Sequence, residues 1–386
     1  MTPIEVNRRM KRLLIQPLDV LMFRSERPFI AVESHVAKLG IISPLTFEGA
    51  LKSKIFSENL NEDYSLEDFQ RKKKESEEEF KKRIKKILKE NSKLKNVLEV
   101  IGHPTVDSES FIQVFGAFLS KNGTEWLPIP NDIVRIEDKN EISKLNPIIK
   151  REFKIPRENI YTCFSDYSKI EGINGLISFD NMIEYLKGKK PRNSWIKNEQ
   201  PYFKEPRTGI KIKKGTKKSE KGHLYSAEFL RLKEKWSFII WYQSPIEVPE
   251  GIIKLGGENR SAISTKIENI QLSKMFKKII KEVNKDGKFK IYLATPSYFD
   301  GYKPPTDTLM EILGVNHLEL VSALPGKPAY IGGYDFAMNK EKPLKRWVNS
   351  GAVYYYEFEG KIQNLKLPLK VIKEKVDMRC AFIGRW

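Results

Sequence analysis

The spacing of apolar residues along the chain predicts many short strands and a few amphipathic helices. The first strand is predicted within 12–23, where apolar and β-compatible residues dominate. The segment that follows contains Pro28, which ends the strand pattern. Asn122-Gly123 between two β-rich runs is typical of a tight hairpin turn. Another hairpin is predicted within 224–243, and further strands are predicted at 288–299, 329–336 and 352–362.

Three helices are predicted from caps and from apolar residues at helical spacing. Ser43 is a suitable N-cap and Pro44 a suitable first residue for a helix that extends through the apolar positions of 45–56. A short helix is predicted at 179–189. The stripe of apolar residues in 271–283 predicts an amphipathic helix with one buried face.

A charged insertion at 58–99 holds twelve Lys or Arg and eleven Asp or Glu, so its charges nearly cancel. Glu77–Lys81 and Glu78–Lys82 are spaced four apart in the stabilising order, and Phe80, Ile84, Ile87 and Leu88 form one stripe. We therefore predict an amphipathic helical insertion with a solvated outer face. Its balanced charge does not favour nucleic-acid binding.

The order strand, helix, hairpin, helix matches the start of a ferredoxin-like βαββαβ unit, and the second half repeats the same mixture. A length of 386 residues with 40% apolar content is enough for about two domains. The sequence thus predicts an α+β protein.

A basic segment at 187–222 holds eleven Lys and two Arg against three Glu, which is 13 − 3 = +10 of the formal net charge of +19. A phosphodiester backbone would neutralise this excess, and Trp195, Tyr202 and Phe203 would offer faces on which unpaired bases can stack. The segment therefore favours RNA binding. The alternative is a solvated loop whose lysines only confer solubility.

Three shorter motifs add candidate contacts to phosphate. In IKIKKGTKK, Ile210 and Ile212 alternate with lysines, which predicts an extended ribbon with cations on one side. Gly256-Gly257 followed by Arg260 could form an anion-binding nest or merely a tight turn. Lys345-Arg346-Trp347 could combine a phosphate contact with stacking, or could be a surface turn with a partly buried tryptophan.

Other classes of protein receive little support. No apolar run approaches the length of a membrane helix, and the two cysteines lack CxxC neighbours, which fits a reducing cytoplasm. No cofactor is predicted, and the four histidines form no pair typical of a metal site. His35 and His223 are the only candidates for ribonuclease chemistry, and a lone histidine is more often structural.

An ordered set of fragments resembles the RAMP-superfamily third subunit of the type III-B CRISPR (Cmr) effector complex. The fragments are PLDVLMFRSERPF, ISPLTFEGAL, LPIPND, EPRTGIKIKKGTKKSEKGHLY, LGGENRSA, LATPSYF, IGGYDF and KPLKRWVNSGAVYYYE. The resemblance implies two ferredoxin-like domains, which we expect at 1–200 and 201–386, with a basic loop at 204–224.

The same resemblance implies a non-catalytic subunit that holds the 5′ tag of the CRISPR RNA (crRNA). It would bridge the large polymerase-like subunit to the backbone RAMP subunits, with target recognition delegated to guide pairing. The expected RNA-binding residues are Arg24, Arg27, Arg207, Lys211, Lys213, Lys214, Lys217, Lys218, Gly256, Gly257, Arg260, Lys345 and Arg346.

Two other hypotheses remain open at this point. One is an endoribonuclease of the same superfamily that processes CRISPR RNA, which would require histidine-dependent cleavage. The other is a protein scaffold whose basic loop contacts an acidic subunit.

Overall fold

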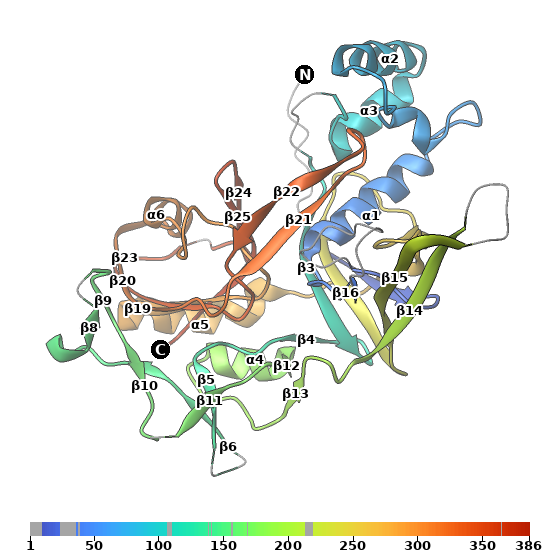
Figure 1. Cartoon of the computed structure of the whole chain (residues 1–386). Helices are drawn as coiled ribbons and strands as arrows, with labels where there is room; N and C mark the ends of the chain where they lie inside the picture. The colour runs from blue at the N-terminus through green and yellow to red at the C-terminus, as the bar shows by residue number, and fades with distance from the viewer. Residues whose placement is uncertain are drawn as a thin grey trace. The chain divides into compact units, whose positions relative to one another are not determined.

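The structure is a computed structural model that describes residues 10–23, 36–37, 39–105, 110–137, 139, 141–155, 157–167, 169–212, 219–363 and 365–386. The chain forms two compact units and alternates between them. The first unit comprises Met1–Ala117, Tyr202–Asn269 and Ile331–Lys345, and the second comprises Phe118–Pro201, Ile270–Tyr330 and Arg346–Trp386. Figure 1 shows strands mixed with helices, and the described residues form six α-helices, which confirms the α+β class.

In the first unit, five strands of one sheet follow the order β3-β16-β1-β18-β17, and β2, β14 and β15 form another sheet. Helix α1 packs on the five-stranded sheet through the rings of Phe47 and Phe238, whose centroids are 5.4 Å apart. The elements are β1 (Lys11–Pro17), β2 (Val36–Ala37), α1 (Pro44–Ser57), α2 (Glu77–Glu90), α3 (Ser92–Ile101), β3 (Gln113–Lys121), β14 (Tyr202–Ile212), β15 (Ser219–Leu232), β16 (Trp236–Gln243), β17 (Gly251–Lys254) and β18 (Ser261–Ile267).

The predicted hairpin within 224–243 is wrong. β15 pairs with β14 along most of its length, whereas β16 pairs with β1, with Leu13 opposite Ile240. Six consecutive residues of β16 are buried, because the strand lies inside its sheet with neighbours on both sides. The apolar run that sequence alone assigned to a hairpin is therefore a central core strand.

The charged insertion forms the predicted amphipathic helix and a second helix after it. Phe80, Ile84, Ile87 and Leu88 are buried in α2, as the stripe predicted. Ser76 caps the helix together with Glu79, since each side chain bonds to the other residue's amide. Before α2, a 3₁₀ turn spans Leu66–Phe69.

In the second unit, β3 joins strands in the order β13-β12-β4-β3, and a five-stranded sheet follows the order β20-β23-β19-β25-β24. Helix α5 packs on this second sheet through stacked rings of Phe276 and Phe382. The longer elements are β4 (Thr124–Pro128), β5 (Ile133–Ile136), β6 (Glu141–Lys144), β12 (Gly175–Ser178), α4 (Phe179–Leu186), α5 (Leu272–Asp286), β19 (Lys288–Leu293), α6 (Thr306–Leu313), β20 (Val315–Leu324), β23 (Val353–Gly360), β24 (Leu369–Lys373) and β25 (Val376–Gly384).

Shorter strands complete this unit: β7 (Asn146–Pro147), β8 (Lys154–Ile155), β9 (Ile160–Tyr161), β10 (Cys163–Phe164), β11 (Ile170–Gly172) and β13 (Trp195–Lys197), with a 3₁₀ turn at Arg151–Phe153. A separate pair, β21 (Ala329–Asp335) and β22 (Lys340–Trp347), forms a two-stranded ribbon. The hairpin at Asn122-Gly123 is confirmed, since β3 and β4 pair across it. The ferredoxin-like arrangement and the domain boundary near residue 200 stay predictions.

A buried polar cluster lies within the second unit. The Asp132 carboxylate is fully buried and accepts hydrogen bonds from the hydroxyls of Tyr185, at 2.8 Å, and Tyr355, at 2.6 Å. The ammonium nitrogen of Lys290 lies 4.0 Å from Asp132 Oδ2 and 3.2 Å from the centroid of the Tyr185 ring. Burial lowers the pKa of Lys290 well below its usual value.

Candidate nucleic-acid interface

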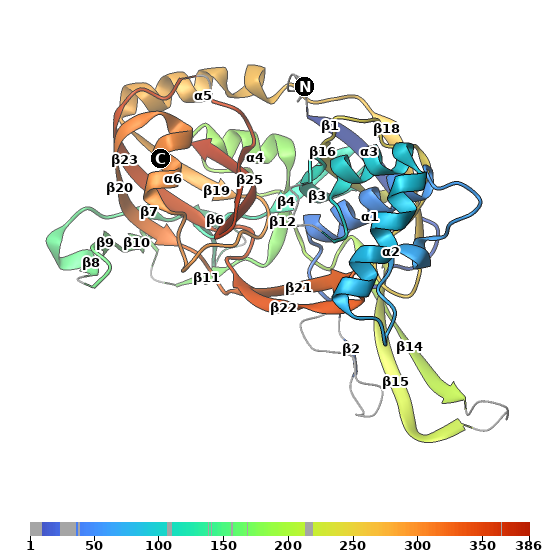
Figure 2. The ribbon, with the colours of Figure 1, turned by 90° about the horizontal axis from the view of Figure 1, so that it is seen from above.

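The basic segment continues into a long β-hairpin formed by β14 and β15. Figure 2 shows both strands extending well beyond the helices of their unit. The two strands pair from Tyr202 opposite Leu232 to Ile210 opposite Leu224, with an irregularity before Ile212. The extended ribbon predicted from alternating Ile and Lys is therefore confirmed in its backbone, up to the end of β14.

One face of this hairpin carries an aromatic and charged cluster at its base. Glu205 and Phe229 are direct partners across the strands, and Arg207 follows two positions later on the same face of β14. The guanidinium carbon of Arg207 lies 5.1 Å from the Phe229 ring centroid, and that of Arg260 lies 4.8 Å from it. Phe229, only 5% exposed, thus anchors two arginines from distant parts of the sequence.

Arg207 is held by carboxylates. Its guanidinium donates to Glu205 Oε1 at 2.6 Å and to Asp19 Oδ2 at 3.4 Å, and Arg231 bonds the same two carboxylates. Hydrogen bonds from Arg231 and then Arg207 lower the pKa of Glu205. Burial of Asp19 acts to raise its pKa, but hydrogen bonds from the Val20 amide and Arg231 outweigh this effect. The four groups balance in charge, so their main effect is to fix Arg207.

Arg260 has no such partner. Its Nε is buried without a hydrogen-bond acceptor, and no ion pair to it occurs among the described residues. Its charge is therefore available to an anion, while the ring of Phe229 fixes the plane of the guanidinium. Within the described part of this cluster, Arg260 is the strongest candidate for a phosphate contact.

The Gly256-Gly257 turn places Arg260 beside the segment that precedes Arg24. Gly256 has a φ of +78°, and a Cβ built on it would lie 2.4 Å from the carbonyl oxygen of Met22. The Gly257 amide donates to that same oxygen at 2.8 Å. This amide is thus used internally, so the tight-turn interpretation of the motif is confirmed and its anion-nest interpretation fails at Gly257.

The structure brings together only part of the predicted site. Arg207, Gly256, Gly257 and Arg260 meet around Phe229 and Met22. Lys345 and Arg346 lie on β22, where both side chains are exposed, and their neighbour Trp347 is 7% exposed and packs against Tyr298. Trp347 therefore offers no free face for base stacking. Arg24, Arg27, Lys213, Lys214, Lys217, Lys218 and the side chain of Lys211 lie outside the described residues.

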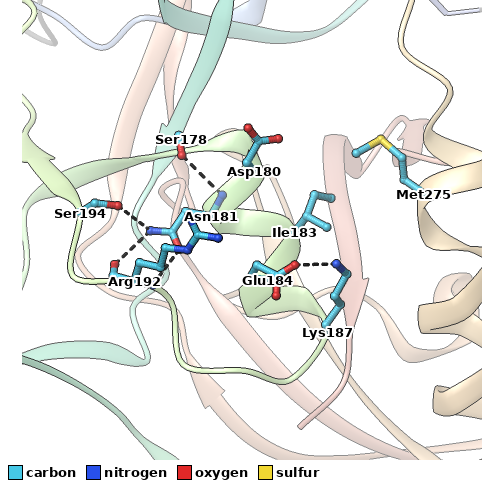
Figure 3. A pocket seen from close by; sticks show the side chains of 9 residues that line it. All are labelled: Ser178, Asp180, Asn181, Ile183, Glu184, Lys187, Arg192, Ser194 and Met275. Carbon is cyan, nitrogen blue, oxygen red and sulfur yellow. Dashed lines mark hydrogen bonds and ion pairs between the residues drawn. The ribbon is translucent and has the colours of Figure 1, made fainter.

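The start of the basic segment is partly neutralised. Lys187 and Lys189 both donate to Glu184, and these hydrogen bonds lower the pKa of Glu184 to about 2. Glu184 and Lys187 help to line a cavity of about 310 Å³ that runs along α4 (Figure 3). There, Asn181 uses its amide to bind the backbone of Arg192. The cavity's polar groups therefore order the chain, and most Lys and Arg residues of the segment follow this start in the sequence.

Sequence reasoning missed the residues that organise the cluster. The missed residues are Phe229 and Arg231, which stand two apart in AEFLRL, and Glu205, which stands two positions after the predicted stacking residue Phe203 in the opposite strand. Period-two alternation was the available signal, but the pairing of 224–232 with 202–210 was needed to read it. Phe203 is 58% exposed, and the Lys233 ammonium lies 4.6 Å from its ring centroid.

The described residues contain no group of three His, Cys, Asp or Glu side chains that could hold a metal ion. Within the same residues, no helix is long and apolar enough to span a bilayer. His35 and the side chain of His223, the candidates for nuclease chemistry, lie outside what the structure describes.

Comparison with known proteins agrees with the resemblance found from the sequence motifs. The sequence model of the family described as "CRISPR-associated protein (Cas_Cmr3)" matches residues 13–378, which is nearly the whole chain. A curated relative, "CRISPR system CMR subunit Cmr3" of Saccharolobus solfataricus, is 24% identical over 261 residues. That alignment covers 66% of this chain and 62% of the relative, so the chain spans less than two thirds of the relative's length.

Two solved structures are also similar. One is described as a type III-B Cmr-beta bound to cognate target RNA and AMPPnP; it has 20% sequence identity and a TM-score of 0.46, covering 89% of this chain and 86% of the other. The second is described as type III-B Cmr-beta bound to cognate target RNA, with 19% identity, a TM-score of 0.44 and the same coverage.

Proposed function

Because the chain belongs to the Cmr3 family of CRISPR-associated proteins, we propose that it is a non-catalytic RNA-binding subunit of a type III-B effector complex. In this proposal it holds the 5′ tag of the crRNA. The main observation in favour of this proposal is that Arg207 and Arg260 both contact the Phe229 ring at the base of the β14–β15 hairpin.

The charge distribution around this cluster supports RNA as the ligand. Lys187, Lys189 and Arg207 are bound to carboxylates, so the local excess of +10 in the basic segment comes mainly from its other cations. Neutralising phosphates with such cations releases counterions, which favours binding and makes it sensitive to salt. Exposed Phe203, on the same face as Glu205, offers a surface for an unstacked base.

The proposal extends to architecture and partners. The chain would contain two ferredoxin-like domains, and the subunit would bridge the large polymerase-like subunit to the backbone RAMP subunits. The α+β mixture and the paired strands support the ferredoxin-like domains. Arg24, Arg27 and Lys211 would add contacts to the tag, because the segment preceding Arg24 lies beside the Gly256 turn.

The test is charge reversal in the hairpin. Lys213, Lys214, Lys217 and Lys218 are all changed to Glu, and affinity for an RNA bearing the 5′ tag is measured by fluorescence anisotropy over a range of salt. We expect a loss of affinity of at least tenfold and a shallower salt dependence.

A matched control makes the same change in charge on an exposed helix face. Lys274, Lys277, Lys278 and Lys281 are exposed on α5, and replacing them with Glu should leave tag binding within about twofold. An equal loss of RNA affinity in both variants would show that the effect comes from the net charge of the protein and not from the hairpin. Unchanged affinity in the hairpin variant would contradict the proposal, and histidine-dependent cleavage of the RNA would favour the endoribonuclease.

A further inference from the structure

A groove opens between the helical insertion and the tip of the β21–β22 ribbon, all within the first unit. Figure 1 shows the ribbon ending beside the insertion. The cavity measures about 710 Å³, which is large enough for several side chains of a ligand. Its apolar lining comes from α1, the 3₁₀ turn, α2, α3 and the ribbon tip, and includes Phe56, Phe69, Phe80, Leu98, Ile101 and Phe336.

Hydrogen bonds join the ribbon tip to the insertion, and the residues they connect are at least 266 positions apart in the sequence. The Arg71 amide donates to the Ala337 carbonyl at 2.7 Å, and Asn339 Nδ2 donates to the Arg71 carbonyl at 3.2 Å. Within the tip, the Met338 amide donates to Asp335. These bonds hold Phe336 over the groove instead of leaving the ribbon end unattached.

The wall of the groove that is formed by the insertion is also held by hydrogen bonds. Arg83 of α2 makes two bonds to the Glu75 carboxylate, at 2.7 and 2.8 Å, and donates to the carbonyls of Asp68 and Gln70. These contacts order the loop that carries Arg71. The groove is therefore preformed, which lowers the entropic cost of filling it.

The groove has an apolar floor and positively charged side chains at its rim. Phe336 is 45% exposed, although it is a large apolar side chain at a cavity mouth. Lys81 of α2 and Lys340 and Lys342 of β22 line the same cavity, and all three are exposed and without an ion-pair partner among the described residues. Three unpaired ammonium groups around an apolar surface complement a ligand that has both apolar and anionic groups.

We propose that this groove binds an acidic segment of a partner polypeptide, with an apolar side chain inserted against Phe336 and carboxylates on the lysine rim. RNA fits less well, because Glu77 and Asp335 also line the groove and would repel a continuous phosphate backbone. A peptide can place its few carboxylates on the lysines and its apolar residue on the floor. This inference does not depend on the RNA contacts proposed for the hairpin.

The test uses the assembled complex purified through this chain from cells that contain its natural partners. Phe336 is replaced by the photoreactive residue p-benzoylphenylalanine, the complex is irradiated, and crosslinked peptides are identified by mass spectrometry. We expect a crosslink to another polypeptide at an apolar residue flanked by Asp or Glu.

Charge reversal shows whether the lysine rim contributes. Changing Lys81, Lys340 and Lys342 to Glu in the photoreactive chain should lower the crosslink yield at least about tenfold. The matched control changes Lys82, Lys85 and Lys86, which are exposed on α2 but do not line the groove, and should keep the yield. Affinity for tag RNA should stay unchanged in both variants, which separates this site from the hairpin.

Three outcomes would overturn the inference: a crosslink to RNA, a crosslink to a segment without acidic residues, or no crosslink at all. A crosslink yield that survives reversal of the rim would also overturn it. Circular dichroism of each variant checks that the exposed substitutions leave the helices folded.

Discussion

Gly256 approaches the carbonyl oxygen of Met22 so closely that any side chain at this position would collide with the backbone, since a built Cβ lies 2.4 Å from that oxygen. The contact joins the Gly256-Gly257 turn to the end of the segment that leads into Arg24. Two parts of the sequence that carry predicted RNA contacts are thus locked together by one glycine.

Changing Gly256 to Ala should therefore destabilise the first unit and weaken tag binding. Its positive φ alone costs about 1–2 kcal/mol for a residue with a Cβ, and displacing the Met22 backbone adds roughly 1–3 kcal/mol. Thermal unfolding and RNA anisotropy measure the two effects. Gly314→Ala is the control, because Gly314 has a φ of +66° with nothing within 4 Å of a built Cβ. Equal destabilisation by the two changes would show that the close approach is unimportant.

Arg260→Ala should weaken RNA binding several-fold and reduce the slope of log affinity against log salt by about one. The reason is that Arg260, stacked on Phe229, has no carboxylate partner among the described residues, whereas Arg207 has two. Titrations at several salt concentrations give both quantities. Arg260→Lys should keep the slope but lose affinity, because an ammonium cannot stack as a planar guanidinium does.

A matched change at Arg135, which is paired with Glu171 in the second unit, should leave both the affinity and the slope unchanged. If Arg260→Ala binds tag RNA like the unmodified chain at every salt concentration, Arg260 makes no phosphate contact.

Local patterns in the sequence predicted most elements because those elements depend on neighbouring residues. The cap at Ser43, the Asn122-Gly123 turn and the stripes of α2 and α5 are set by interactions within a few positions. Strand pairing is different, since register depends on residues far apart in the chain. For this reason the segment 224–243 was assigned to one hairpin although its halves belong to two sheets.

The same limit applies to the candidate site: its individual residues could be predicted from local sequence, but their meeting in space could not. Charge and glycine spacing indicated Arg207, Gly256 and Arg260 individually, but their meeting at Phe229 depends on three separate segments. The groove beside α2 could not have been predicted, because it requires Arg71 to bond with Ala337. The charged insertion looks self-neutral in sequence, yet its Lys81 has no ion-pair partner among the described residues and lines the groove together with Lys340 and Lys342 of β22.

The Glu75–Arg83 pair should make the insertion sensitive to acid. Hydrogen bonding from Arg83 lowers the pKa of Glu75 from 4.5 to about 2. A carboxyl whose pKa is lower in the folded state stabilises that state above the unfolded pKa, and this contribution is lost as pH falls from about 4.5 towards 2. The stability of the insertion should therefore decline over that window.

Glu75→Gln tests this expectation. At pH 7 the substitution should cost about 1.5–3 kcal/mol, because it removes charged hydrogen bonds to Arg83. The difference in melting temperature between Glu75→Gln and the unmodified chain should narrow as pH falls below about 4. Glu78, exposed on α2, provides the control Glu78→Gln, which should cost no more than about 0.5 kcal/mol at pH 7. A constant difference across the window would contradict the assignment.

The buried cluster of the second unit gives opposite expectations for Asp132 and Lys290. Asp132→Ala leaves the hydroxyl of Tyr185 without its acceptor and removes the shorter bond of Tyr355, so it should cost roughly 3–5 kcal/mol. Lys290→Met should cost less than about 1 kcal/mol or be stabilising, because the Lys290 Nζ makes no hydrogen bond and Asp132 keeps both tyrosine donors.

The pH dependence separates this explanation from simple packing. The lowered pKa of Lys290 means that the unfolded chain binds a proton that the folded chain does not, between the folded pKa and 10.5. The contribution of Lys290 to stability should therefore rise with pH through that window, and Lys290→Met should reduce the pH dependence, leaving the part due to Lys144, whose pKa burial also lowers. Urea unfolding at several pH values up to 10 measures it. Parallel curves for Lys290→Met and the unmodified chain would show that Lys290 stays charged in the folded protein.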